Sequence, residues 1–266
     1  MRLALAGALC PMRLDGEAAA AHRSLWLREG TELCIDRPRE GAFSYLAVGG
    51  GFAIRPVIGS VSLHLRAALG GLDGRTLRGQ DRLPLRDPAP AGEHEVMLDP
   101  LPLERDLAVR IVPGPQDDRF TKAGLDTLLA QEFTVSNRAD RMGYQLDGPE
   151  IAHRDGFNIV SDATVAGSIQ VPGNGRPIIL LADRQTTGGY PKIATVVSTD
   201  LRRVAQRRPG EAVRFAAVDV ETAVRLARER AAAVATLPGR LQPATAMVDR
   251  LLAANVAGDA VDASSS

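Results

Sequence analysis

The stretch DRQTTGGYPK, residues 183–192, contains one of only two lysines in the chain. The other is Lys122, and all the remaining basic residues among the 32 Lys and Arg are arginines. Lysine carries a compact amine with three donors and a pKa that burial shifts readily, whereas arginine is a planar fork that stays protonated. Because arginine supplies nearly every other positive charge in this chain, a lysine indicates a position where an amine is needed. Lys192 is therefore predicted to belong to a functional site. The alternative is a surface lysine at the start of a strand.

The residues before Lys192 add the other groups of an anion site. Glycine backbone N–H groups, threonine hydroxyls and a guanidinium stand close together in the sequence, supplied by Gly188, Gly189, Thr186, Thr187 and Arg184. They follow an apolar stretch, residues 178–182, and the ends of strands commonly display reactive groups. The alternative is a β-bulge or wide turn, in which the glycines relieve strain and Asp183 caps a backbone donor.

A second polar stretch, residues 137–156, contains candidates of the same kind. Arg141 is suited to clamp a carboxylate or phosphate, and His153 is suited to move a proton. The alternatives are a local ion pair between Asp140 and Arg141 and a solvated histidine. The four histidines are too scattered to predict a metal site, and the chain has none of the motifs GxxxxGK[ST], GxGxxG, GxSxG or HExxH.

Composition narrows the class of protein. The 266 residues are 45% hydrophobic, and 32 acidic residues balance 32 basic ones. No broad positive field is therefore expected to attract nucleic acid or an anionic membrane. The two cysteines, Cys10 and Cys34, are too few for the disulfide framework of a secreted protein and favour a reducing cytoplasm. Residues 3–9 are predicted to form a strand rather than a signal peptide, and no apolar run is long enough to span a membrane.

Apolar patterns predict a mainly β fold. In the first hundred residues we expect strands at 3–9, 42–48 and 53–58, a hairpin turn at Gly79 and Asp81, and a linker at 86–95. Further strands are predicted at 108–112, 132–136, 142–147, 157–161, 165–171, 177–182, 193–198 and 212–218, with a glycine turn at 171–177. Helices are predicted after Thr121 as N-cap, at 221–235 and at 243–254. Many short strands separated by turns favour a barrel or a sandwich.

Three blocks of the sequence carry a family resemblance. RMGYQLDGPE, GSIQVPGNGRPIILLADRQTTGGYPKIATVVSTDL and QRRPGEAVRF resemble the biotin-dependent carboxyltransferase-like family, closely over residues 120–218 and more weakly over 45–85. This family includes the C component of 5-oxoprolinase, the regulator KipA, allophanate hydrolase subunit 2 and the carboxyltransferase part of urea carboxylase. The resemblance implies two cyclophilin-like β-barrel subdomains, here at residues 1–99 and 100–238, followed by a C-terminal helix and tail at 239–266. Members usually begin with an extra segment, so the N-terminal barrel is expected to be shortened.

The resemblance also implies a function. The leading hypothesis is a protein similar to the C component of an ATP-dependent 5-oxoprolinase. With a KipI-like or B-type partner and an A-type partner, it would open the lactam of 5-oxoproline, a small acidic substrate. ATP would be shared with or held by the partners. One alternative is the carboxyltransferase component of a biotin-dependent urea or amide carboxylase. The other is a KipA-like interaction protein without turnover.

On this resemblance, the site lies where residues 183–192 face residues 137–144. Arg141, Arg184 and Lys192 are expected to bind the carboxylate or a phosphorylated intermediate. Asp183 is expected to act as a base or to hold Arg184, and Gln185 and Thr187 to orient the lactam oxygen. The full candidate set comprises Lys192, Asp183, Arg184, Gln185 and Tyr190 as catalytic residues, and Arg141, Tyr144, Thr186, Thr187, Gly188 and Gly189 as substrate-binding residues. Tyr144 or Tyr190 is expected to close the pocket, and no metal is expected.

Overall fold

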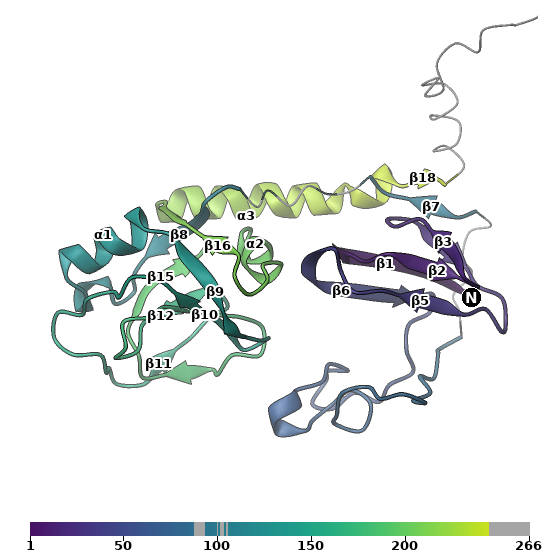
Figure 1. The fold of residues 1–266 in the computed structure, drawn as a ribbon, viewed down its shortest axis with the longest axis horizontal. Helices are drawn as coiled ribbons and strands as arrows, with labels where there is room; N and C mark the ends of the chain where they lie inside the picture. The colour runs from purple at the N-terminus through teal and green to yellow at the C-terminus, as the bar shows by residue number, and fades with distance from the viewer. Residues whose placement is uncertain (88–93, 100, 102–103, 105, 245–266) are drawn as a thin grey trace, which may run out of the picture. The chain divides into compact units, whose positions relative to one another are not determined.

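The computed structural model describes residues 1–87, 94–99, 101, 104 and 106–244 (Figure 1). Its contacts divide the chain into two compact units. Unit 1 comprises Met1–Arg39, Ser44–Pro100 and Leu237–Ser266, and unit 2 comprises Glu40–Phe43 and Leu101–Thr236. Within the described residues, no helix is both long and apolar enough to cross a membrane.

Unit 1 is built from strands of two to nine residues. Their bounds are β1 (Arg2–Leu9), β2 (Met12–Leu14), β3 (Glu17–Ala19), β4 (Ser24–Trp26), β5 (Leu33–Ile35), β6 (Glu40–Val48, whose first four residues belong to unit 2), β7 (Val96–Met97) and β18 (Gln242–Pro243). They form sheets in the orders β4-β1-β6, β3-β2-β5 and β18-β7. β1 pairs with β4, β2 with β3 and β5, and β18 with β7 in antiparallel fashion. Alternation along β1 buries Leu3 and Leu5, which pack with Met12, Leu25 and Leu27 in a small core.

Residues 49–87 of unit 1 form turns rather than regular strands. A single short 3₁₀ helix, η1 (Leu65–Ala67), lies in this stretch. The predicted strand at 53–58 is wrong, because Ile58 and Gly59 have left-handed φ angles of 49° and 76° and fold the chain back so that Val57 pairs with Ser60. The turn predicted near Gly79 is present, with Asp81 N–H donating to the Arg78 carbonyl, but the residues on either side form no strands, so it is not a hairpin.

Unit 2 is dominated by an eight-stranded sheet that forms a nearly closed barrel. The strand order is β16-β9-β10-β13-β12-β15-β8-β17, and every pairing is antiparallel except β17 with β8. The bounds are β8 (Val109–Pro113), β9 (Phe133–Ala139), β10 (Gly143–Asp147), β12 (Ser168–Gln170), β13 (Ile178–Leu180), β15 (Lys192–Val196), β16 (Ala212–Val213) and β17 (Phe215–Ala217). A separate pair is formed by β11 (Asp162–Ala163) and β14 (Thr187–Gly188).

Three α-helices among the described residues all belong to unit 2. They are α1 (Lys122–Ala130), α2 (Leu201–Ala205) and α3 (Val220–Ala235). The 3₁₀ helices η2 (Asp117–Arg119) and η3 (Leu237–Arg240) complete the described elements. Thr121 caps α1 as predicted, since its hydroxyl accepts a hydrogen bond from Gly124 N–H.

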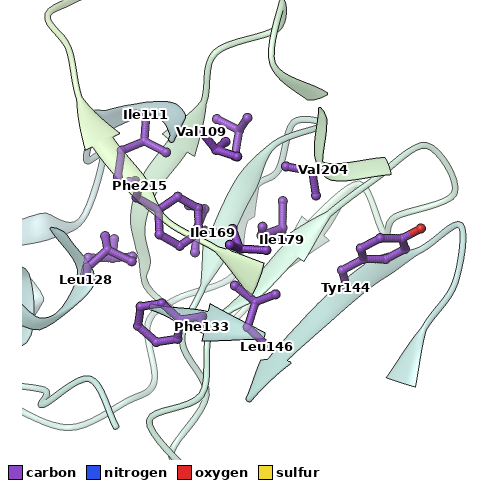
Figure 2. Close-up of a cluster of buried hydrophobic side chains, with 14 of the residues drawn as sticks. Val109, Ile111, Leu128, Phe133, Tyr144, Leu146, Ile169, Ile179, Val204 and Phe215 are labelled. Atoms are coloured by element: carbon purple, nitrogen blue, oxygen red, sulfur yellow. The ribbon is translucent and has the colours of Figure 1, made fainter. Parts of the chain in front are cut away.

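The core of unit 2 comes from the inward faces of the barrel strands. Figure 2 shows Phe133 and Leu146, which are fully buried, among other apolar side chains contributed by strands and by α1 and α2. The labelled members are Val109, Ile111, Leu128, Phe133, Tyr144, Leu146, Ile169, Ile179, Val204 and Phe215. This core makes the barrel a rigid support for residues at the strand ends.

The prediction of a mainly β fold with a barrel is confirmed, with differences in detail. Residues 157–161 form no regular strand, and residues 212–218 split into β16 and β17 because the two segments pair with different neighbours, β9 and β8. The α2 helix was not predicted. The linker at 86–95 and the helix at 243–254 fall largely outside the described residues, although Gln242 and Pro243 pair with Met97 and Val96 as strand β18.

Replacing Thr121 with alanine should remove the N-cap of α1. We expect the Thr121→Ala variant to lower the free energy of unfolding by about 1 kcal/mol, measured by urea denaturation. Thr127→Ala is the matched control, because the Thr127 hydroxyl only donates back to the Ala123 carbonyl within the same helix. Equal losses in both variants would contradict the capping role.

Candidate active site

Lys192 is the first residue of β15, and its side chain is only 2% exposed. Its Nζ donates to Asp162 Oδ2 at 2.6 Å and to the Ala163 carbonyl at 2.9 Å. The alternative of a surface lysine is therefore wrong. A buried ammonium is stable only when it is paired and hydrogen-bonded, so Asp162 and Ala163 have to stay beside Lys192.

Gln116 connects both partners of this ion pair. Its side-chain oxygen accepts from Lys192 N–H at 3.0 Å, its own N–H donates to the Lys192 carbonyl at 3.0 Å, and its Nε2 donates to Asp162 Oδ2 at 2.9 Å. The hydrogen bond from Lys192 is the main cause that lowers the pKa of Asp162, with further hydrogen bonds from Gln116 and from Ala163 N–H. Asp162 therefore stays ionised opposite the buried amine.

The β11 and β14 strands hold the glycine-threonine stretch against the residues around Asp162. Gly188 pairs with Asp162 and Thr187 with Ala163. Backbone hydrogen bonds continue on both sides of this pair. Ile159 N–H donates to the Gly189 carbonyl and Thr164 N–H to the Thr186 carbonyl, both at 2.9 Å. Residues 186–189 are therefore held next to the carboxylate that binds Lys192.

Glycine at position 188 serves close packing. Neither Gly188 nor Gly189 has a left-handed φ angle. A Cβ on Gly188 would lie 2.5 Å from Nε2 of Gln170, a side chain that is 2% exposed. Gln170 in turn accepts from Gln185 Nε2 at 3.0 Å and donates to the Tyr190 carbonyl at 3.3 Å. Gln185 is thus held by its amide nitrogen, and Tyr190 stays 40% exposed.

Arg141 and Asp183 form a second ion pair. Arg141 Nη2 donates to Asp183 Oδ1 at 3.0 Å, and Asp183 N–H donates to the Arg141 carbonyl at 2.8 Å. Two predictions are therefore wrong, namely that Asp183 holds Arg184 and that Asp140 forms an ion pair with Arg141. Asp183 holds Arg141 and not Arg184, and Asp140 accepts from Met142 and Gly143 N–H instead of pairing with Arg141.

Arg184 is held mainly by the backbone. Its Nη1 donates to the Leu181 carbonyl at 3.3 Å, and its buried Nε has no hydrogen-bond partner within the described residues. A guanidinium with a spare donor is suited to bind an oxyanion of a ligand. Its role in binding stays a prediction.

Tyr144 lies in the interior of unit 2, and His153 is partly buried. Tyr144 is 3% exposed, belongs to the core and donates its hydroxyl to the Ala205 carbonyl at 2.9 Å (Figure 2). Burial is the main cause that raises the pKa of Tyr144 to about 12. His153 hydrogen-bonds to the Val171 carbonyl at 3.0 Å and packs against the Phe120 ring at 5.0 Å. Among the tyrosines expected to close a pocket, only Tyr190 is therefore placed at the surface.

The structure joins most of the candidates into two groups. One group combines Lys192 with residues 185–190 through Asp162, Ala163 and Gln170, and the other is the Arg141–Asp183 pair. Gln116, Asp162 and Gln170 were missed from the sequence. They lie 76, 30 and 22 positions before Lys192, so no local spacing signals them. Across the described residues, no cluster of three or more His, Cys, Asp or Glu side chains is arranged to hold a metal ion.

Comparison with known proteins points to one family. Residues 1–217 match the family model described as carboxyltransferase domain, subdomain A and B. The chain is 36% identical over 231 residues to the C subunit of 5-oxoprolinase from Escherichia coli strain K12, covering 85% of this chain and 73% of the relative. It is 37% identical over 233 residues to the protein of the same name from Haemophilus influenzae, covering 86% and 73%.

A more distant likeness concerns the fold alone. The crystal structure of the Kluyveromyces lactis urea amidolyase superimposes with a TM-score of 0.80 at 20% identity. The match covers 91% of this chain but only 16% of that much longer protein.

The lowered pKa of Asp162 gives a pH-dependent prediction. We expect the Asp162→Asn variant to have a lower free energy of unfolding than the wild type at neutral pH. The difference should persist above the pKa of an unfolded aspartate, about 4, and be lost as the pH falls through the lower pKa of the folded state. Urea denaturation at several pH values measures it. The control is Asp126→Asn, because Asp126 pairs with the other lysine, Lys122, on an exposed helix face; identical profiles for both variants would contradict the buried pairing.

The raised pKa of Tyr144 gives a second prediction. Titration of the chain followed by ultraviolet difference absorbance should show one tyrosine that ionises near pH 12, and Tyr144→Phe should remove that phase. Because the folded-state pKa lies above that of an unfolded tyrosine, about 10, the stability that Tyr144 contributes is present below pH 10 and lost as the pH rises through the folded value. Tyr190→Phe is the control, and loss of the late phase in that variant would contradict the assignment.

Proposed function

Because the chain belongs to the carboxyltransferase domain family with subdomains A and B, we propose that it acts as the C component of an ATP-dependent 5-oxoprolinase. Two relatives with 36% and 37% identity bear the name of the C subunit of 5-oxoprolinase, and the chain spans 73% of each. In this proposal the assembled enzyme opens the lactam of 5-oxoproline to glutamate. The observation that carries the catalytic part is the buried Lys192 amine, held by Asp162 at the edge of the glycine-threonine stretch.

Partner proteins follow from this proposal. The relatives are named as one subunit of an enzyme, which implies an assembly, and we propose that a KipI-like or B-type component and an A-type component complete it. ATP is shared with or held by these partners. We place the assembly in the cytoplasm, where Cys10 and Cys34 stay as the free thiols of the structure.

The chemistry requires help at the lactam oxygen. An amide is a poor electrophile, so its carbonyl oxygen has to be polarised or phosphorylated before water adds to the carbon and the C–N bond breaks. In the polarised route negative charge develops on that oxygen, and in the phosphorylated route it lies on the phosphoryl group; fixed cations and N–H donors stabilise the charge in either case. Lys192 uses two of its three ammonium protons for Asp162 and Ala163, which leaves the third for a ligand oxygen. Arg184 and the hydroxyls of Thr186 and Thr187 supply further donors in this proposal.

Carboxyl transfer to urea or a related amide is the second candidate. The match of residues 1–217 to a carboxyltransferase domain model supports it, and the reaction would use a carboxylated biotin carried by another protein. A KipA-like role as an interaction protein without turnover is the third. One reconstitution separates all three: the purified chain is mixed with its A-type and B-type partners, and ADP release is measured with and without 5-oxoproline. Assembly with ADP release that ignores 5-oxoproline would refute the 5-oxoprolinase proposal, and consumption of carboxybiotin would establish carboxyl transfer.

The two lysines of the chain provide a matched pair of variants. In the reconstituted complex we expect Lys192→Met to lower 5-oxoproline-dependent ADP release by about 100-fold or more, as for loss of one donor to a developing oxyanion. Lys122→Met should stay within about twofold, because the Lys122 side chain is 87% exposed and its ion pair with Asp126 lies on the surface. Circular dichroism checks that both variants are folded. Full activity of a folded Lys192→Met variant would remove Lys192 from the catalytic machinery.

A further inference from the structure

Lys192 combines a buried amine with partners that lie at the surface. The Lys192 side chain is 2% exposed, whereas the side chain of Asp162, which accepts from its Nζ at 2.6 Å, is 50% exposed. The second acceptor, at 2.9 Å, is the carbonyl of the next residue, Ala163. One short segment therefore lies between the amine and the solvent. A ligand oxygen can reach an amine that is covered in this way only when the segment moves.

This segment comprises residues 156–163, which we call the strap. All of its residues are exposed apart from Ile159, which is half-buried, and none of them belongs to the hydrophobic core of unit 2. Val160, in the middle of the strap, is 92% exposed. Burial of apolar surface is the main force that holds a segment in place. The strap is therefore bound more weakly than the strands of the barrel.

Hydrogen bonds hold the strap in place of apolar contacts. Its strand β11 has two residues and pairs with β14 (Figure 1). Ile159 N–H donates to the Gly189 carbonyl at 2.9 Å, and Gln116 Nε2 donates to Asp162 Oδ2 at 2.9 Å. Hydrogen bonds near the surface exchange for hydrogen bonds with water at little net cost. The charge-assisted hydrogen bond from Lys192 to Asp162 is the strongest type of contact among them.

The chain is anchored on both sides of the strap. Before it, Arg154 N–H donates to the Arg119 carbonyl at 2.8 Å. After it, Thr164 is 6% exposed, and its hydroxyl donates to the Gln185 carbonyl. Gly156, at the start of the strap, has a left-handed φ angle of 87°, and a Cβ there would meet nothing within 4 Å. A glycine in open space can change its backbone angles without a clash, so Gly156 is suited to act as a hinge.

We propose that the strap is a lid over Lys192, with Gly156 as its hinge and Asp162 as the group that holds it closed. When the strap lifts, the Lys192 amine is exposed and a ligand oxygen enters. When it closes, Asp162 and the Ala163 carbonyl return to two of the ammonium protons, and the third stays with the ligand. This inference rests on the proposed function for the identity of the ligand, but the opening of the strap needs no turnover.

Amine labelling tests the lid directly, because the chain has only two lysines. The folded chain is treated with the N-hydroxysuccinimide ester of acetic acid, and acetylation of each lysine is followed by mass spectrometry of peptides. We expect Lys192 to react about 10-fold or more slowly than the exposed Lys122, because it reacts only while the strap is open. Asp162→Asn should accelerate the labelling of Lys192. Asp126→Asn, which removes the charge opposite Lys122, is the control and should leave the labelling of Lys192 unchanged.

A disulfide across the strap gives a second variant, which keeps Asp162. An ideal Cβ on Gly189 lies 3.8 Å from Ser161 Oγ, and Gly189 has no left-handed φ angle, so cysteines at these two positions are within reach of a bond. Oxidation of the Ser161→Cys/Gly189→Cys double variant should slow the acetylation of Lys192 by about 10-fold or more, and a reductant should restore the rate. Peptide mass spectrometry identifies the cross-link. Gly189→Cys alone, treated identically, is the control and should show no such dependence on oxidation.

Two results would overturn the proposal. Equal labelling of Lys192 in the oxidised and the reduced double variant would show that the amine is reached without movement of the strap. Labelling of Lys192 only at urea concentrations that unfold the whole chain would show that the strap does not open in the folded protein. In the reconstituted complex, oxidation of the double variant should also abolish 5-oxoproline-dependent ADP release. The expected labelling together with ADP release that ignores 5-oxoproline in the wild type would support the lid and refute only the proposed function.

Discussion

The candidate site depends on one physical constraint, the burial of the Lys192 ammonium. A charge removed from water is costly unless a counter-charge and hydrogen bonds replace its hydration. Asp162 and the Ala163 carbonyl supply these replacements for the Lys192 ammonium, and Gln116 holds the Lys192 backbone and the Asp162 carboxylate; all three come from parts of the chain outside β15. Because Asp162 also pairs with Gly188 in the β11–β14 ladder, the same ion pair positions the glycine-threonine stretch. Loss of this pair would therefore disturb both the charge and the backbone of the site.

Sequence patterns predicted those parts of the fold in which local rules and tertiary structure agree. Thr121 caps α1, and α3 follows the apolar periodicity of residues 221–235. The strands of the barrel were found because their inward faces are apolar. Residues 53–58 were mistaken for a strand because their composition suits one, whereas left-handed conformations at Ile58 and Gly59 turn the chain. The prediction failed because the pattern of apolar and polar side chains carries no information on the backbone angles that make a turn.

The site was predicted in part for a similar reason. Lys192 was identified because lysine is rare in this chain, a chemical signal that needs no structure. Its partners could not be found this way, since the contact with Asp162 exists only after β11 pairs with β14 and β12 pairs with β15. Tyr144 illustrates the opposite error. Its place in a polar motif favoured a role at a pocket, but it lies on the strand β10 with alternating burial, and its ring faces the core.

The glycines of the motif show how a packing requirement can resemble a ligand requirement. Gly188 was interpreted as a backbone approach to an anion, yet the atom that excludes a side chain there belongs to Gln170. Gln170 is buried, and its side-chain amide hydrogen-bonds to Gln185 and to the Tyr190 carbonyl. The absence of a side chain at Gly188 leaves room for this amide, which holds residues 185–190 from the interior of the protein. Gly188 is thus explained by the protein interior. The case for a ligand beside residues 185–192 rests on the third proton of the Lys192 ammonium and on the exposed residues Thr186 and Thr187.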